Sequence, residues 1–203
     1  MIRLSELKLP LDHAPDALLQ AVARVLGLAP ADFASHTVFK RSFDARKAEL
    51  LQVYIVDVQL ADPAREPALL QAFAANPHVQ PAPDMAYRAP AHAGESSAPR
   101  PVVVGFGPCG IFAALLLAQM GFKPIVLERG KTVRERTKDT WGLWRKSELN
   151  PESNVQFGEG GAGTFSDGKL YSQIKDPRFL GRKVMEEFVK AGAPPEILYV
   201  AHP

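Results

Sequence analysis

The chain contains one cysteine, few histidines and almost no excess of charge, and each of these shortages weighs against a class of function. Because Cys109 is the single cysteine, no disulfide can form within the chain, and chemistry that passes electrons through a cysteine pair is disfavoured. The histidines lie far apart without a second cysteine, so the sequence predicts no metal site. They are His13, His36, His78, His92 and His202. The net charge of +2 at pH 7 makes a polyanion an unexpected partner.

The sequence also has no long uninterrupted hydrophobic run. Residues 101–122 carry no charged side chain, but three glycines and a proline interrupt the first half of this stretch. A membrane span needs about 20 consecutive apolar residues, so we expect no membrane partner. The first ten residues, MIRLSELKLP, contain charges and lack the apolar core of a signal peptide. We therefore expect a cytoplasmic protein.

Residues 101–130, PVVVGFGPCGIFAALLLAQMGFKPIVLERG, contain the parts of a dinucleotide-binding βαβ unit in order. The β-branched run 102–104 predicts a strand that is buried on both faces of a parallel sheet. A helix is expected over 111–120, because apolar residues fill it and a glycine follows. The apolar stretch 124–127 predicts the second strand.

The turn between the first strand and the helix has the pattern GxGxxG. Gly105 permits the turn, Gly107 has no side chain to keep a pyrophosphate away, and Gly110 lets the helix pack closely against the strand. Pro108 and Cys109 complete the turn at the start of the helix. Because the positive end of the helix dipole faces this turn, the pattern predicts a phosphate-binding site.

An acidic residue ends the second strand, as the same motif requires. Glu128 lies 128 − 110 = 18 residues after the last glycine, close to the spacing of about 20 at which an acid binds the adenosine ribose. Arg129 and Arg134 follow it and are candidates for contact with the cofactor phosphate or adenine. The other cations of this region are expected on a solvated helix face. They are Lys131, Arg136, Lys138, Arg145 and Lys146.

A second glycine-rich segment, NVQFGEGGAGTFSDGKL, begins at Asn154. Its glycines would let the backbone pass close to a ligand, and the apolar Phe157 argues against a flexible solvated loop. Lys169 and Tyr171 are further candidates for positions near a flavin ring. The candidate cofactor contacts in this segment are Gly160, Gly161, Ala162, Gly163, Thr164, Phe165 and Asp167.

The combination of GFGPCG, VLERG and NVQFGEGGAGTFSDGKL resembles the bacterial NAD(P)/FAD-dependent oxidoreductases, also called FAD-dependent dehydrogenases, which are related to the glutathione-reductase-like flavoproteins. The resemblance implies a cytoplasmic oxidoreductase with bound FAD, a small-molecule substrate that the sequence does not specify, and NAD(P)H as electron donor through regions absent from this chain. Members of that family are longer, so we expect the chain to stop part-way through the flavoprotein.

The expected fold is α/β, with an incomplete Rossmann-like FAD-binding region at 101–203 preceded by a small α+β domain. Residues 1–87 predict the element order βαββαβ, which is the ferredoxin-like arrangement. Within it, Leu4 and Leu7 are three residues apart, so the first strand needs a bulge. Residues 88–100, RAPAHAGESSAPR, are expected to form a linker.

Two other functions stay open at this point. The chain could be a non-catalytic nucleotide-binding fragment, because only two or three parallel strands are visible in it. It could also belong to an RNA-associated flavoprotein that binds RNA through its first domain. Residues 1–100 hold 10 Lys and Arg against 11 Asp and Glu, and they lack the aromatic pattern of RNA-recognition motifs, so nucleic-acid binding is disfavoured.

Overall fold

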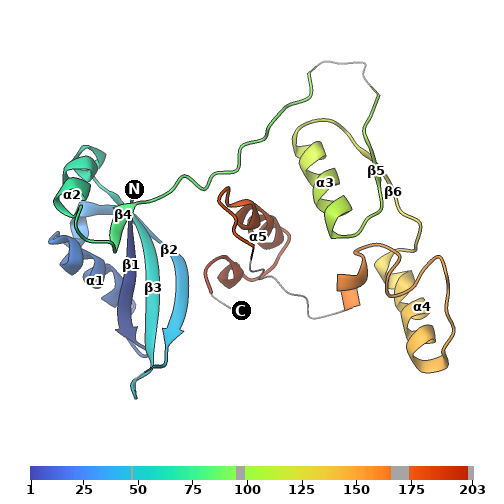
Figure 1. The fold of residues 1–203 in the computed structure, drawn as a ribbon, viewed down its shortest axis with the longest axis horizontal. Helices are drawn as coiled ribbons and strands as arrows, with labels where there is room; N and C mark the ends of the chain where they lie inside the picture. The colour runs from blue at the N-terminus through green and yellow to red at the C-terminus, as the bar shows by residue number, and fades with distance from the viewer. Residues whose placement is uncertain (47, 95–98, 166–173, 201–203) are drawn as a thin grey trace. The chain divides into compact units, whose positions relative to one another are not determined.

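The computed structural model describes residues 1–46, 48–94, 99–165 and 174–200 of a mixed α/β protein (Figure 1). The chain divides into two compact units. Unit 1 consists of Met1–Ala86 together with Asp176–Pro203, and unit 2 consists of Tyr87–Lys175. None of the described helices is both long and apolar enough to cross a membrane.

The first 81 residues have the expected order βαββαβ. The four strands form one antiparallel sheet with the order β2-β3-β1-β4. The predicted bulge is confirmed, since the pairing of β1 with β3 shifts register between Leu4 and Leu7. The elements are β1 (Ile2–Pro10), α1 (Ala17–Leu26), β2 (Phe33–Asp44), β3 (Leu51–Leu60), α2 (Glu66–Ala72) and β4 (Val79–Pro81), with 3-10 turns at Pro30–Asp32 and Pro63–Arg65.

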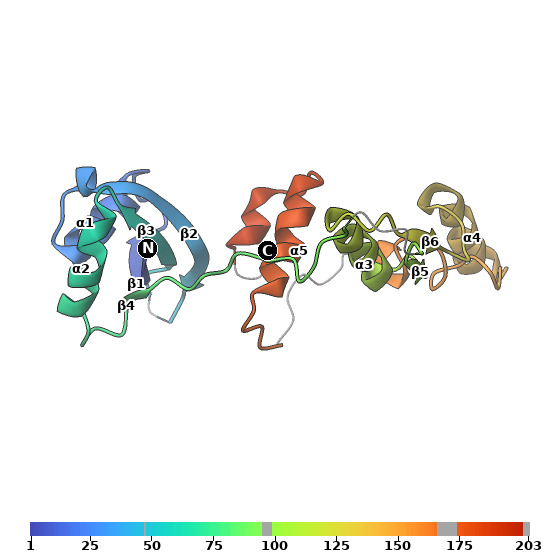
Figure 2. The ribbon, with the colours of Figure 1, turned by 90° about the horizontal axis from the view of Figure 1, so that it is seen from above.

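Both helices of this part pack on one face of the sheet, where the core of unit 1 lies (Figure 2). In α1 the apolar residues Leu18, Val22 and Leu26 are spaced by four, so they form one buried stripe. Gly27 ends α1 in the left-handed conformation at φ 66°, which favours glycine. The sheet contributes the remaining fully or nearly buried apolar residues of this core. They are Ile2, Leu4, Leu7, Tyr54, Val56, Val58 and Val79.

An ion pair joins the two central strands of this sheet. Arg3 and Asp57 are directly opposite in the β1–β3 register, and the guanidinium donates from Nε and Nη2 to the two carboxylate oxygens at 2.6 and 2.7 Å. Asp57 is only 4% exposed. The guanidinium also lies 3.7 Å from the ring centre of Phe39. Because the pair is largely buried, water cannot readily take the place of one partner when that partner is removed.

We expect Arg3→Met to lower the free energy of unfolding of unit 1 by about 3 kcal/mol, because it leaves a buried carboxylate without its partner. The double variant Arg3→Met, Asp57→Val should recover most of this loss, since it removes both charges. Urea unfolding followed by circular dichroism measures both effects. The control is Arg24→Met, which removes an exposed arginine of α1. A single variant as stable as this control would contradict the prediction.

Residues from Asp176 group with unit 1, whereas we expected 101–203 to form one domain. This segment contains α5 (Leu180–Lys190) and a 3-10 turn at Pro195–Leu198. Beyond this turn, Val200 forms an isolated parallel bridge with Arg41 of β2. The amide of Arg41 donates to the Tyr199 carbonyl at 2.6 Å, so the segment meets the edge strand of the sheet.

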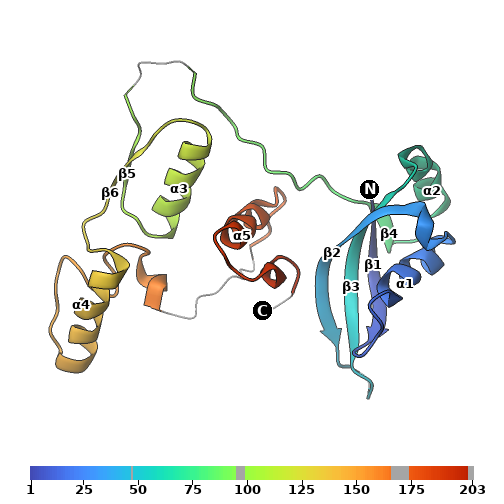
Figure 3. The ribbon, with the colours of Figure 1, turned by 180° about the vertical axis from the view of Figure 1, so that it is seen from behind.

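Unit 2 begins with a parallel βαβ unit (Figure 3). Its two strands pair in register, from Val102 with Ile125 to Val104 with Leu127. The strand over 102–104 was expected to be buried on both faces, but Val104 is 82% exposed. Every residue of β6 is exposed as well, because β5 and β6 pair only with each other among the described residues. The elements are β5 (Val102–Val104), α3 (Pro108–Gln119), β6 (Ile125–Leu127), α4 (Val133–Lys146) and a 3-10 turn at Ala162–Phe165.

Candidate functional site

The glycine turn after β5 is tightly folded. Gly105 has φ 93°, a conformation that favours glycine, and its amide donates to the Leu127 carbonyl of β6 at 2.7 Å. A Cβ atom added to Gly110 would lie 1.9 Å from the Gly105 carbonyl oxygen and 3.6 Å from Val103 Cγ1. The helix can therefore start this close to the strand only with glycine at position 110, as the sequence predicted.

Gly107 is different, because neither the backbone conformation nor the packing of the protein requires a glycine at this position. Its φ is −78°, which any residue can adopt, and an added Cβ would meet only the Cα of Gly161, at an ordinary 3.7 Å. Gly107 is the residue that caps the N-terminus of α3. The absence of a side chain here keeps open the space in front of that helix end, where unpaired N–H groups favour an anion.

Glu128, at the end of β6, binds backbone amides of two turns, the one that follows β5 and the one that follows β6. One carboxylate oxygen accepts a hydrogen bond from the Phe106 amide at 2.6 Å, and the other accepts one from the Gly130 amide at 2.8 Å. The Gly130 amide, followed by those of Phe106, Arg129 and Gly158, holds the pKa of the Glu128 carboxyl below its usual range, although burial opposes this. The carboxylate is therefore ionised at neutral pH and binds protein amides in addition to any ligand.

The second glycine-rich segment packs directly on the first. The Gly160 amide donates to the Phe106 carbonyl at 2.8 Å. A Cβ added to Gly161, which has φ 66°, would lie 3.0 Å from Pro108 Cδ and 3.1 Å from Gly107 Cα. Residues 54 positions apart in the sequence, from 160 − 106, thus meet, and the two segments form one continuous surface.

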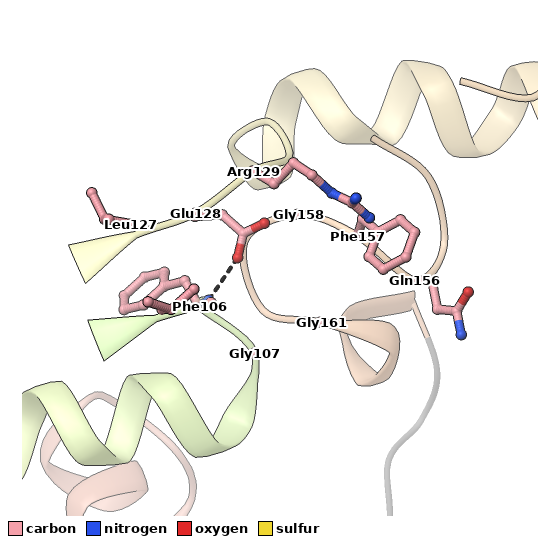
Figure 4. A pocket seen from close by; sticks show the side chains of 11 residues that line it. Phe106, Gly107, Leu127, Glu128, Arg129, Gln156, Phe157, Gly158 and Gly161 are labelled. Atoms are coloured by element: carbon pink, nitrogen blue, oxygen red, sulfur yellow. Dashed lines mark hydrogen bonds between the residues drawn. The ribbon is translucent and has the colours of Figure 1, made fainter. Parts of the chain in front are cut away.

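A pocket of about 550 Å³ lies at the carboxyl ends of β5 and β6, between these two segments (Figure 4). This is the edge of a parallel sheet at which ligands usually bind. The Glu128 carboxylate and the Phe106 amide face each other across its floor. The lining residues are Val104, Gly105, Phe106, Gly107, Leu127, Glu128, Arg129, Gln156, Phe157, Gly158 and Gly161.

One side of the pocket consists of a stacked pair of flat groups. The guanidinium carbon of Arg129 lies 3.8 Å from the ring centre of Phe157, and its Nε lies 3.4 Å from a carboxylate oxygen of Glu152. Both Arg129 and Phe157 line the pocket and remain partly exposed to solvent. The pair therefore offers a planar, cationic surface beside the Glu128 carboxylate.

The structure brings some of the predicted residues together at the pocket and places others outside it. Gly105, Gly107, Glu128, Arg129 and Gly161 line it. Arg134 is exposed on α4 and is not among the lining residues, and Asp167, Lys169 and Tyr171 lie outside the described residues. The other predicted residues flank the pocket in the α3 turn or in the second segment without lining it. They are Pro108, Cys109, Gly110, Gly160, Ala162, Gly163, Thr164 and Phe165.

Six lining residues were not among the predicted contacts, and two of them, Val104 and Leu127, are the last residues of β5 and β6. Phe106 contributes through its backbone, which accepts from Gly160 and donates to Glu128, and a residue that acts through its backbone leaves no sequence signal. Gln156, Phe157 and Gly158 precede the positions that were chosen in the second segment. Their place in the same glycine-rich motif, to which Gly158 itself belongs, was the available signal.

Arg136 was expected on a solvated helix face, and this expectation is wrong. The side chain is fully buried. Its Nε donates to the carbonyl oxygen of Asn154 at 2.7 Å and its Nη1 to that of Glu159 at 2.6 Å. Its Nη2 donates to the carbonyl oxygens of Val155 and Gly161 at 2.6 and 2.7 Å. Burial lowers the pKa of the guanidinium, and the carbonyl oxygens of the second segment compensate for the water it has lost.

The other candidates for chemistry in the described part of the chain are the free cysteine and possible metal ligands. Cys109 is exposed and carries a free thiol at the start of α3. No group of three or more His, Cys, Asp or Glu side chains among the described residues is arranged to hold a metal ion. The candidate site is therefore the pocket between the two glycine-rich segments.

Comparison with known proteins gives relatives without an assigned activity. The model of a family described as "Domain of unknown function (DUF8436)" matches residues 1–59, which include β1, α1 and most of β3. The chain is also 42% identical over 205 residues to an uncharacterized protein of Clostridium beijerinckii. That alignment covers 98% of this chain and 36% of the relative, so the chain spans about a third of the length of the relative it matches.

Proposed function

We propose that unit 2 binds FAD and is the Rossmann-like part of a flavin-dependent oxidoreductase of the dehydrogenase type. The observation that carries this proposal is the pocket at the carboxyl ends of two parallel strands, formed by the glycine turn before α3 and by the second glycine-rich segment. The first provides a helix N-terminus for a pyrophosphate. The second contributes Gln156, Phe157, Gly158 and Gly161 to the lining of the same pocket.

The residues fit an FAD molecule better than NADP. Glu128 is ionised beside the turn, and a second negative charge on the ribose would be repelled by it. Gly107 leaves the approach to the α3 N-terminus free of side-chain atoms. When bound, the flavin would supply the hydride chemistry, while the protein binds, orients and shields it. In the whole protein, NAD(P)H would be the electron donor, acting through regions outside this chain.

For unit 1 we propose a docking role within a ferredoxin-like fold. The order βαββαβ and the sheet order β2-β3-β1-β4 support this fold. Arg3 and Arg41 lie on its strands, but Arg3 is paired with Asp57 and the Arg41 guanidinium lies 5.3 Å from the Tyr199 ring centre. Because these contacts occupy both guanidinium groups within the unit, they weigh against RNA binding through them.

The proposal is tested by isolating the protein and identifying its nucleotide. We expect FAD to be released on denaturation and to be identified by chromatography. The apoprotein should then bind FAD more tightly than NAD or NADP in a fluorescence titration. Glu128→Gln should weaken FAD binding by about tenfold, because glutamine has one acceptor oxygen for the two amides that Glu128 serves.

Three results would replace the proposal. Binding of ADP and NAD equal to that of FAD would indicate a nucleotide-binding module without flavin chemistry. Salt-dependent binding of RNA by unit 1 would replace its docking role and favour an RNA-associated flavoprotein. A folded protein that contains no FAD and takes up none would remove the flavin assignment altogether.

A further inference from the structure

Much of the pocket wall depends on a segment that has little regular structure of its own. Gln156, Phe157, Gly158 and Gly161 line the pocket, and residues 147–161 contain no described helix or strand. Arg136 donates to the carbonyl oxygens on both sides of Gln156 and Phe157, namely those of Val155 and Gly158, the latter at 3.4 Å. Hydrogen bonds from the Arg136 side chain therefore hold this wall together with isolated backbone bonds, such as those from Gly160 to Phe106 and from Glu159 to Lys131, rather than with a regular ladder.

The backbone of the segment is closely fitted to the arginine. A Cβ added to Gly158, which has φ 126°, would lie 2.5 Å from Arg136 Cδ and 3.0 Å from Nε. Gly130 is equally close on the other side, since its added Cβ would lie 2.5 Å from the Gly158 Cα. Gly158 is thus held between Arg136 and the turn that follows Glu128.

The hydrogen-bond pattern requires an arginine. The acceptors around Arg136 among the described residues are backbone carbonyls and the Thr164 hydroxyl, and they surround a planar fork. A lysine ammonium has three donors on one atom and cannot reach all the oxygens that are spread around the edge of the guanidinium group. A methionine of similar length would leave the carbonyl oxygens buried without donors.

We infer that Arg136 is a positioning residue for the pocket: its guanidinium holds the 154–161 segment in place, so that nucleotide affinity depends on a side chain that does not line the site. The inference rests on the proposed function for the identity of the ligand, FAD. The role of Arg136 in holding the segment is independent of that identity.

The test compares Arg136→Lys and Arg136→Met with Lys138→Met, which removes an exposed cation from the same helix and was not predicted to contact the cofactor. Hydrogen exchange of the 154–161 amides, measured without nucleotide, reports the position of the segment. An FAD titration reports the pocket. We expect exchange to be faster and the dissociation constant to rise by about tenfold in both Arg136 variants, and neither to change in the control.

A second control separates positioning from general stability. Ala114 is buried in α3, and Ala114→Gly should weaken unit 2 without touching the 154–161 segment. Equal loss of FAD affinity in Ala114→Gly and Arg136→Lys, at equal thermal stability, would overturn the inference. Unchanged exchange of the 154–161 amides in Arg136→Lys would also overturn the inference. If Arg136→Met does not fold, the comparison uses Arg136→Lys alone.

The two proposals fail in different ways. If the unaltered protein binds no FAD, the proposed function is lost, but faster exchange in the Arg136 variants would still support the holding role. If the unaltered protein binds FAD and Arg136→Lys binds it equally well despite faster exchange, the proposed function stands and the inference is wrong.

Discussion

Replacing Gly107 by valine is expected to weaken FAD binding by about 100-fold or more while unit 2 remains folded. At this position φ is −78° and ψ is −174°, an extended conformation that valine adopts readily and that suits a residue before proline. Because an added Cβ meets only the Gly161 Cα at 3.7 Å, the protein can accommodate the branch point. The bound pyrophosphate would lose the space in front of α3.

The measurement is an FAD titration paired with thermal unfolding of the apoprotein. Gly94→Val is the matched control, because its added Cβ has no heavy atom within 4 Å and Gly94 does not line the pocket. We expect the control to keep both the affinity and the unfolding midpoint. If Gly107→Val bound FAD as tightly as the control, the pyrophosphate would have to lie elsewhere.

Replacing Gly110 by alanine, in contrast, should lower the stability of unit 2 itself, even when no ligand is present. The new Cβ would lie 1.9 Å from the Gly105 carbonyl oxygen and 2.9 Å from its carbonyl carbon, so the turn must open or the helix must move. Forcing atoms into a packed site costs about 3 kcal/mol in such cases. For a unit of this size the unfolding midpoint should fall by roughly 15 °C.

Calorimetry of the apoprotein checks this, with Gly107→Ala as the control three residues away. That variant adds the same methyl group at a position where the nearest heavy atom is 3.7 Å away. The loss of a glycine cap should cost it no more than about 1 kcal/mol. Equal midpoints for the two variants would mean that the contact between the helix and the turn is looser than described.

The glycine turn illustrates how much of the site could be predicted from the sequence. The pattern of strand, GxGxxG, helix, strand and acid fixed the places of Gly105, Gly110 and Glu128, because each step depends on residues close together in the chain. The packing role of Gly110 is confirmed, whereas the binding roles of Gly107 and Glu128 stay predictions. That Glu128 also binds the amides of Phe106 and Gly130 could not be predicted, since spacing does not reveal where a carboxylate points.

In unit 1, local patterns were enough to predict the order of the elements and the bulge between Leu4 and Leu7. They did not predict that residues from Asp176 onward would group with this unit, because the contact between Arg41 and Tyr199 joins positions 158 residues apart, from 199 − 41.

The sequence by itself determined the parallel βαβ unit, the glycine turn and the order βαββαβ, since hydrophobic periodicity and glycine placement act within one element or between neighbours. Only the tertiary structure decided burial. Val104 belongs to an apolar run and is 82% exposed, whereas Arg136 belongs to a charged run and is fully buried. Burial depends on which distant segment covers a side chain, and for Arg136 that segment supplies the carbonyl oxygens that replace water.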